Sequence, residues 1–162
     1  MTNIPNKVNP MGVGVAGQIA KGLHSYSVLF HGTAKDDTVC VGCFVQATDN
    51  DGIVRGASGN AIDHKILGVA IKDHYVSATK NTAIYAPNDL VTYLTKGVVY
   101  IETKSPAKVG QYVFLKNDNG TLAFDDANTK ENHTYTGFRV AVGTGSAVNT
   151  ETGFDIIAII SE

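Results

Sequence analysis

The sequence is poor in cysteine, arginine and charge, and each shortage excludes a class of protein. Two cysteines in 162 residues are too few for a disulfide-rich scaffold or a four-thiolate zinc site. Only Arg55 and Arg139 carry guanidinium groups, and the formal net charge is −2. A nucleic-acid partner is therefore not expected, because such proteins present a basic face. Charged residues make up 17%, below the usual ~25%, which favours an uncharged polar surface suited to contact with other proteins.

Long apolar runs are also missing. No stretch approaches the ~20 residues that span a bilayer, so no membrane association is expected. The N-terminal residues lack a charged region followed by an apolar one, which a secretory signal would require. We therefore expect the protein to be made in a cytoplasm.

Short β-branched runs, separated every eight to twelve residues by turn sequences, dominate what is present. Glycine-containing turns at Asp49–Gly52 and Asn117–Gly120, and a Lys96-Gly97 pair, are typical of hairpins. The pattern predicts a single all-β domain, an antiparallel β-sandwich, jelly-roll-like fold or barrel of about ten short strands. The predicted strands are Ser25–His31, Val41–Thr48, Ile66–Lys72, Thr82–Tyr85, Leu90–Leu94, Val98–Thr103, Tyr112–Lys116, Gly120–Phe124, Gly137–Val142 and Phe154–Ile160.

Helical periodicity is weak throughout the sequence. The best candidates for helices are Val15–Lys21 and Asp125–Lys130, each about two turns long and each next to glycine or asparagine. Neither is long enough to change the expected fold class.

The first 22 residues differ from the remainder, because they are loop-like and rich in glycine and asparagine. We expect residues 1–22 to form an N-terminal arm and residues 23–162 to form the single β domain. The arm is either a disordered terminus or a docking segment. In the second case its spaced apolar residues would bind a partner: Ile4, Val8, Met11, Val13, Val15 and Ile19.

The arm contains the motif GxGxxG at Gly12–Gly17. A dinucleotide-binding loop requires a buried strand before this motif and a helix after it. The preceding residues include Pro5, Pro10 and three asparagines, which do not form a central strand. We therefore expect no nucleotide cofactor and read the glycines as those of a slim, extended arm.

Cys40 and Cys43 form a CxxC motif that leads into a predicted strand. A redox pair needs its first cysteine at a helix N-terminus, and an offset of three in a strand places side chains on opposite faces. Two free and mostly buried thiols are therefore expected.

Candidate catalytic and metal-binding residues are dispersed along the sequence. The five histidines, at 24, 31, 64, 74 and 133, show no metal-binding spacing. The acidic pairs Asp36-Asp37 and Asp125-Asp126 lie in predicted loops. We expect no catalytic residue, no metal and no cofactor. Tyr93, Tyr100 and Tyr112 could form a sugar-binding platform, although packing or an interface explains them better.

Several segments together resemble the structural cement proteins of tailed bacteriophages. They are Gly12–Ala20, Val41–Val45, Ile66–Lys72, Val98–Ile101, Pro106–Val113 and Phe154–Ile160. The polar stretch Asp125–Tyr135 and the loop Thr144–Thr152 depart from the family pattern.

This resemblance implies a capsid decoration protein located in the virion. Such a protein would bind the outer face of the head and bridge neighbouring subunits of the major capsid protein, and it would self-associate as a homodimer or homotrimer. It would not be an enzyme. One alternative is a carbohydrate- or receptor-binding β-sandwich module of a phage fibre. Another is a small β-barrel enzyme, which would need His24, His31, His64 or His74 to converge with carboxylates in a cleft.

Overall fold

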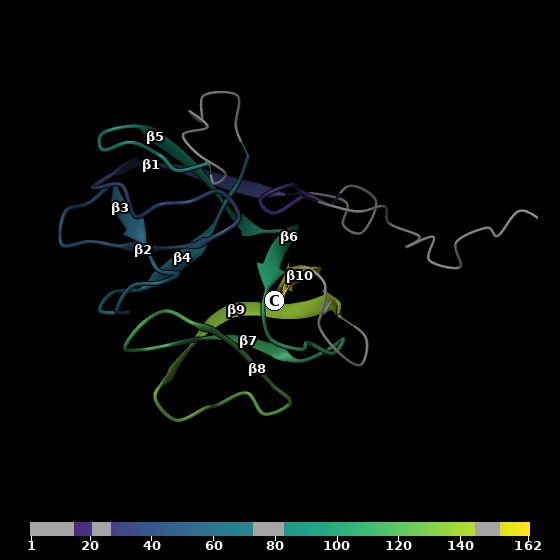
Figure 1. Ribbon diagram of the computed structural model, residues 1–162. Coiled ribbons are helices and arrows are strands. Elements are labelled where there is room, and N and C mark those ends of the chain that lie inside the picture. The colour runs from purple at the N-terminus through teal and green to yellow at the C-terminus, as the bar shows by residue number, and fades with distance from the viewer. Residues whose placement is uncertain (1–14, 21–26, 73–82, 145–152) are drawn as a thin grey trace, which may run out of the picture.

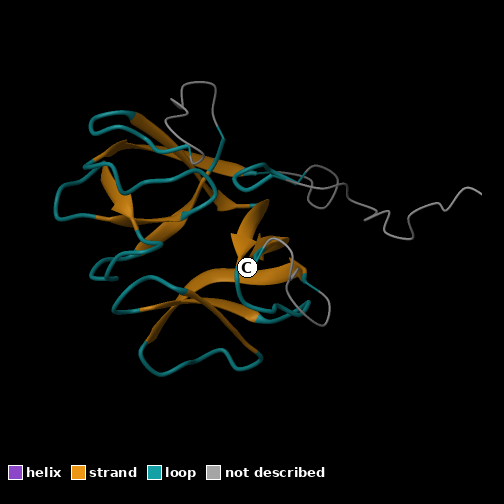
Figure 2. Ribbon diagram, in the orientation of Figure 1, coloured by secondary structure: helices purple, strands orange, loops and turns teal. Residues whose placement is uncertain are grey.

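The computed structural model describes residues 15–20, 27–72, 83–144 and 153–162. In these residues the chain forms ten β-strands and no helix (Figure 2). The prediction of an all-β fold is therefore confirmed. Both helical candidates are wrong: residues 15–20 form a turn and an isolated β-bridge, and residues 126–130 form bends and loop. Glycine and asparagine beside these short segments favour turns over helix.

The first five strands close into a small barrel in the order β1-β3-β2-β4-β5 (Figure 1). Most neighbours are antiparallel, but β1 and β3 are parallel, which differs from the expected purely antiparallel fold. The hairpin at Asp49–Gly52 reverses the chain between β2 and β3. β1 closes the barrel by pairing with β3 on one side and with β5 on the other. The strands are β1 (Val28–Ala34), β2 (Phe44–Ala47), β3 (Ile53–Gly56), β4 (Ile66–Ala70) and β5 (Leu90–Lys96).

The other five strands form an open antiparallel sheet in the order β6-β10-β9-β7-β8. It lies beside the barrel, in green and yellow in Figure 1. The strands are β6 (Val98–Thr103), β7 (Tyr112–Lys116), β8 (Leu122–Asp125), β9 (His133–Val142) and β10 (Asp155–Ser161).

Two strand assignments differ from the sequence-based prediction. The strand Ile53–Gly56 was absent from the predicted set, although its hairpin turn was recognised. In place of the predicted strand Thr82–Tyr85, the described residues from 83 contribute only an isolated bridge between Ile84 and Cys40. A segment this short has no periodicity from which pairing can be read.

The junction between barrel and sheet lies at Gly97, where the prediction of a hairpin is wrong. β5 pairs with β1 and β4, whereas β6 pairs with β10. Gly97 has a φ of 130°, which lets the chain pass from one sheet to the other. Its N–H donates to Ser161 Oγ at 2.9 Å, and its carbonyl accepts from the Ser161 N–H at 3.0 Å.

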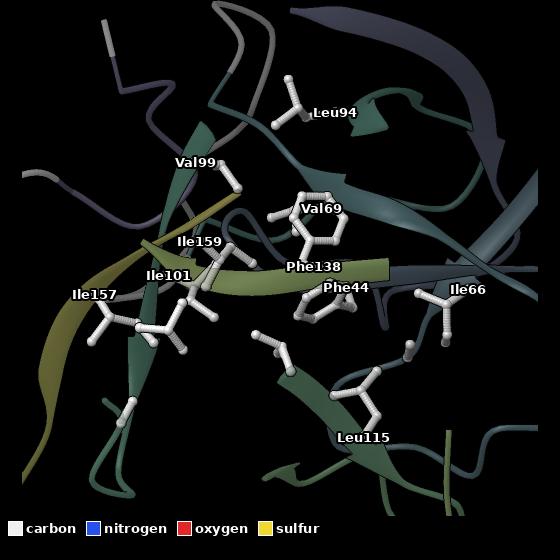
Figure 3. Close-up of a cluster of buried hydrophobic side chains, with 14 of the residues drawn as sticks. Phe44, Ile66, Val69, Leu94, Val99, Ile101, Leu115, Phe138, Ile157 and Ile159 are labelled. Atoms are coloured by element: carbon white, nitrogen blue, oxygen red, sulfur yellow. The ribbon is translucent and has the colours of Figure 1, made fainter. Parts of the chain in front are cut away.

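The main hydrophobic core lies between the barrel and the sheet (Figure 3). Phe44 of β2 meets Phe138 of β9 edge to face, with ring centroids 5.7 Å apart. Val69 and Leu94 contribute from the barrel, and several isoleucines and valines of β6 and β10 face them. A second cluster, which includes Val45 and Tyr85, fills the barrel itself. Because the shared cluster joins both halves, barrel and sheet form one body.

Candidate functional site

The six predicted partner-binding residues fall partly outside the described structure. Ile4, Val8, Met11 and Val13 lie outside it. Val15 is exposed, and Ile19 is half-buried against the main core of its own chain. A partner-binding role for these residues remains a prediction.

Residues 17–20 cover the outer edge of β6. The Gly17 N–H donates to the Tyr100 carbonyl at 2.8 Å, and the Ala20 N–H donates to the Val98 carbonyl at 2.9 Å. In return, the Tyr100 N–H donates to the Gln18 carbonyl at 3.0 Å. The end of the segment expected to be an arm therefore supplies strand-like hydrogen bonds to the sheet.

Gly17, the last glycine of the GxGxxG motif, packs against a turn of the same chain. A Cβ on Gly17 would overlap the side chain of Val41 and lie 2.9 Å from the backbone nitrogen of Gly42. Gly17 also has a φ of 82°, which disfavours any other residue. Residues 18–20, which follow it, run beside β6 and form no helix. Close approach of two backbones explains this glycine.

Cys40 and Cys43 form a disulfide, which corrects the prediction of two free and mostly buried thiols. The motif lies in a tight turn ahead of β2, not within the strand. The Cys43 N–H donates to the Cys40 carbonyl at 3.1 Å, and Gly42 has a φ of 79°. The turn brings the two Cα atoms to 5.4 Å, a usual disulfide separation. The turn packs against Gly17. The disulfide therefore stabilises the turn on which the segment covering β6 rests.

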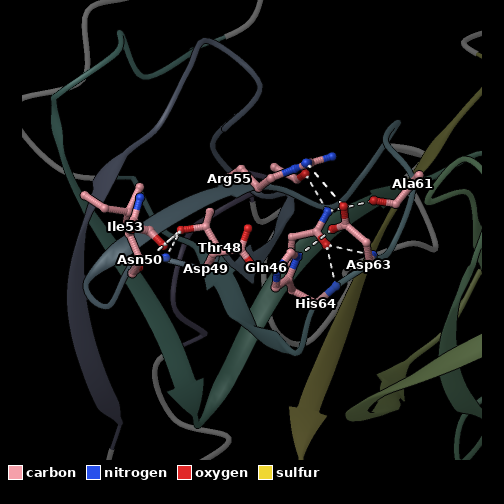
Figure 4. A network of polar contacts seen from close by, with 10 residues as sticks. Gln46, Thr48, Asp49, Asn50, Ile53, Arg55, Ala61, Asp63 and His64 are labelled. Carbon is pink, nitrogen blue, oxygen red and sulfur yellow. Dashed lines mark hydrogen bonds and ion pairs between the residues drawn. The ribbon is translucent and has the colours of Figure 1, made fainter.

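The most connected polar cluster surrounds His64 (Figure 4). Its Nε2 lies 2.9 Å from Asp49 Oδ1, and its Nδ1 lies 2.8 Å from Asp63 Oδ1. Hydrogen bonds to both carboxylates raise the pKa of His64. The bond from His64 in turn lowers the pKa of Asp63, with a smaller contribution from Arg55. A protonated imidazole donating from both nitrogens fits this geometry.

Gln46 of β2 joins this cluster to the barrel wall. Its buried side-chain amide donates to the carbonyls of Gly56 and Ala61, and its oxygen accepts from the N–H groups of Asp63 and His64. These four bonds hold the loop between β3 and β4. The cluster links the loop between β2 and β3 to the loop between β3 and β4, and we call it the His64 clasp.

The other two described histidines, His31 and His133, contact different parts of the chain. His31 bonds Thr92 Oγ1 at 3.0 Å, His133 contacts the Glu131 carbonyl at 2.7 Å, and His24 and His74 lie outside the described residues. Within the described part of the chain, no group of three histidine, cysteine or acidic side chains could hold a metal ion.

Asp36, Asp37 and Asp126 lie in turns and bends as expected, whereas Asp125 is the last residue of β8. Asp36 accepts bonds from the N–H and hydroxyl of Thr38. Asp125 pairs with Lys130 at 2.9 Å, and this bond lowers the pKa of Asp125. Asp36 and Asp125 thus bond to residues of their own loops.

The three tyrosines considered for a sugar-binding platform do not form one. Tyr93 and Tyr100 are buried. The Arg139 guanidinium lies over the Tyr112 ring at 4.4 Å, and Tyr135 meets that ring edge to face. Their rings serve packing rather than an open aromatic surface.

Exposed apolar side chains mark the surface that sequence analysis missed. Leu29 and Phe30 are consecutive residues of β1 and are both exposed. The sequence predicted this strand, but alternation alone would bury one of the two. In the described part of the chain, the structure leaves residues 29–31 of β1 exposed on both faces. Leu90, Val109 and Phe154 are the other large exposed apolar residues beyond residue 20 in the described chain.

The comparisons with known proteins agree with this fold. A family model described as structural cement protein (E217 gp24/Pam3 gp6) matches residues 4–158. A chain of the structure described as the capsid of Myoviridae phage XM1 aligns with a TM-score of 0.61 and 12% identity, covering 90% of this chain and 88% of that one. No curated protein sequence matches.

The structural likeness establishes the fold, and the family model establishes the relationship. The described residues contain no helix long and apolar enough to cross a bilayer. The family consists of phage structural proteins of the virion, and cement proteins associate with capsid proteins. Because the match covers nearly the whole sequence, the chain belongs to the structural cement protein family of phages.

Proposed function

We propose that this protein binds the outer face of the phage head and bridges neighbouring subunits of the major capsid protein. The observation that carries the proposal is the family match over residues 4–158. The family consists of structural proteins of the virion, which supports a binding role. No nucleic acid, membrane or cofactor is needed for this role.

The N-terminal residues are proposed as one capsid contact. Ile4, Val8, Met11 and Val13 alternate with small or polar residues ahead of exposed Val15. Apolar side chains in a narrow segment suit insertion into grooves of a neighbouring protein. Ile19 differs from the others, because it already packs on the core of its own chain. Residues 17–20 would then anchor the contact to β6.

Self-association as a homodimer or homotrimer is the second part of the proposal. A dimer or trimer on a local symmetry axis contacts several capsid subunits at once, and multivalency then raises the avidity above that of any single contact. Such an assembly would increase the resistance of the shell to internal pressure.

The test uses heads of the encoding phage assembled without this protein. Full-length protein should co-sediment with these heads at saturable occupancy and raise the temperature at which they rupture. Deletion of residues 2–14 should leave a folded domain, because it ends before the residues that pair with β6, but should reduce occupancy. The substitution Asn119→Ser, in the turn before β8, serves as a surface control. Absence of binding by the full-length protein would contradict the proposal, and unchanged occupancy after deletion would remove the arm from it.

A further inference from the structure

We infer that the first half of β1 is an edge through which two copies of this chain pair, antiparallel, about a two-fold axis at Phe30. The inference rests on the self-association proposed above and narrows it to a dimer and to one surface. It names Leu29, Phe30 and His31 as the residues at the interface.

The edge is open because β1 extends beyond its neighbour β3. β3 pairs with β1 only at Thr33 and Ala34. Residues 28–32 pair with β5 on one side, and no strand of the described chain pairs with them on the other. The two ends of β1 therefore differ: one is closed into the barrel, and the other has an edge that no described residue pairs with.

Hydrogen bonds at the closed end show which backbone groups point outward. The N–H groups of Thr33 and Lys35 donate toward β3, to Gly52 and Val54, whereas that of Ala34 donates to Asp89 beside β5. Backbone direction alternates along a strand, and the irregular pairing lies before Leu29. The N–H and C=O groups of Leu29 and His31 therefore face the open side.

The side chains make this edge suitable for pairing. Leu29 is 40% exposed and Phe30 is 53% exposed, and they lie on opposite faces of the strand. No acidic, lysine, arginine or proline residue occurs from Ser27 to Ala34. Free edges are ordinarily protected by lysine, proline or a covering segment. This edge contains neither lysine nor proline. Two copies can thus approach without like-charge repulsion.

The edges of the other sheet are protected, which sets β1 apart. Residues 17–20 cover β6 through main-chain hydrogen bonds. β8 spans four residues and ends at Asp125, which is followed by Asp126 and pairs with Lys130. Short length and charge at its end disfavour pairing of β8 with another strand.

The available backbone groups specify one register. With Phe30 opposite Phe30 of the second copy, Leu29 lies opposite His31 of that copy, and each such pair exchanges two N–H···O=C bonds. The four outward groups on each strand are then all used. A register shifted toward the C-terminal end would need Thr33, whose N–H already donates to Gly52.

The axis residue gains the largest contact in this register. Phe30 already stacks on Tyr93, with centroids 6.3 Å apart and planes inclined by 20°. Phe30 would occupy a non-hydrogen-bonded pair, in which Cα atoms lie about 4.5 Å apart and side chains are closest. The two phenylalanines would extend two Tyr93–Phe30 stacks into one aromatic row.

The small size of the edge determines the strength of the dimer. A three-residue pairing with two exposed side chains per copy buries less than the ~800 Å² per partner of a standard stable interface. The dimer should therefore form in a concentration-dependent manner. A second copy fits better than an unrelated chain, because an uncharged edge paired about a two-fold axis is complementary to itself.

Sedimentation velocity of the full chain over a range of concentrations is the first test. The wild type should shift reversibly from monomer to dimer. Phe30→Lys places two ammonium groups opposite each other and should weaken dimerisation by about tenfold or more. Val109→Lys is the matched control, since Val109 is 71% exposed and lies outside the strands, and it should dimerise as the wild type does. A wild type that stays monomeric, or a dimer unaffected by Phe30→Lys, would overturn the inference.

Cross-linking supplies a second test, because a covalent bond accumulates even when the dimer is weak. Thiols introduced by Phe30→Cys should form an intersubunit disulfide, because the expected Cα separation lies in the disulfide range. Two thiols give up two protons and two electrons to one oxidised glutathione, which yields two reduced glutathione molecules. Val109→Cys should remain uncoupled. Equal cross-linking of both variants would contradict the register and the axis.

Head binding separates this inference from the proposed function. If Phe30→Lys is monomeric and still binds heads with reduced avidity, both stand. If the wild type is monomeric but binds heads normally, only the dimer is refuted. If the wild type is monomeric and Phe30→Lys abolishes head binding, the edge pairs with a capsid strand, which also refutes the second-copy assignment.

Discussion

β6 and the first half of β1 are both edge strands, but only β6 is covered by another segment of the described chain. β6 is covered by residues 17–20, which pair with Val98 and Tyr100 through main-chain hydrogen bonds. The first half of β1 carries exposed Leu29 and Phe30 and has no covering strand among the described residues. An uncovered apolar edge is a site for association. The chain therefore covers the edge of β6 with its own residues, whereas the first half of β1 is available to bind another molecule.

The largest predicted effect tests whether the barrel, which contains β1, and the sheet, which contains β6, unfold together. Phe138→Ala removes a buried ring that packs on Phe44 across the barrel–sheet boundary. It should lower the free energy of unfolding by about 3–5 kcal/mol, in one transition measured by calorimetry. Leu90→Ala, at an exposed position, should change stability by less than about 0.5 kcal/mol. Two separate transitions, only one of which shifts, would show that barrel and sheet unfold independently.

The next prediction disturbs the cover of β6 alone. Gly17→Ala introduces a Cβ that overlaps the Val41 side chain, and we expect about 2–4 kcal/mol of destabilisation from this overlap and the positive φ. Gly59→Ala is the control, because Gly59 has a φ of 81° with nothing within 4 Å of the added Cβ; it should cost about 1 kcal/mol. Hydrogen exchange should show lost protection at Ala20 and Tyr100 only in the first variant. Equal effects would mean that packing against the turn is unimportant.

Loss of the disulfide should have a smaller effect on the same edge. The bond between Cys40 and Cys43 closes a four-residue loop, for which the chain-entropy model gives about 2 kcal/mol. Reductant should lower the melting temperature of the wild type and leave a Cys40→Ser/Cys43→Ser variant unaffected. Exchange should increase at residues 17–20 more than at β1. No response of the wild type to reductant would contradict a stabilising role for the disulfide.

The smallest prediction concerns the His64 clasp, which lies apart from both edges. The raised pKa of His64 means that its contribution is complete below the usual pKa of 6.5 and is lost as the pH rises through the higher folded value. The lowered pKa of Asp63 means that its contribution is complete above the usual 3.8 and is lost as the pH falls through the lower folded value. Stability from the clasp should therefore be greatest between pH 3.8 and 6.5.

A His64→Gln variant should flatten the alkaline side of this profile, measured by urea unfolding at several pH values. His133→Gln is the control, since the His133 ring bonds to the Glu131 carbonyl and lies outside the His64 clasp. Dimerisation and the cover of β6 should not change in either variant. An unchanged pH profile in His64→Gln would show that the clasp does not contribute.

Local patterns predicted most of the strands, but not how they are joined into sheets. Short apolar, β-branched runs between turn residues predicted every strand except β3, although β9 begins at His133, four residues before its predicted start. The Lys96-Gly97 pair resembles a hairpin turn, yet Gly97 sends the chain from barrel to sheet. Only packing around Phe44 and Phe138 decides between these two outcomes.

For the candidate sites, too, some features follow from the local sequence and others depend on the fold. An offset of three places Cys40 and Cys43 on opposite faces of a strand, but a turn that ends at Cys43 brings the two cysteines together. The exposure of Leu29 and Phe30 depends on where β3 ends, which their own sequence does not encode. The resemblance to phage structural cement proteins, in contrast, is carried by short glycine- and valine-rich segments spread along the chain. It agrees with the family match over residues 4–158.

Electron cryomicroscopy of intact heads tests the central claim, that this cement protein bridges capsid subunits, most directly. The account predicts density for this chain on the outer face of the shell, with each assembly contacting at least two different major capsid subunits and with the β1 edges of two copies facing each other across a two-fold axis. Density that contacts a single capsid subunit, or lies on the inner face of the shell, would contradict the account.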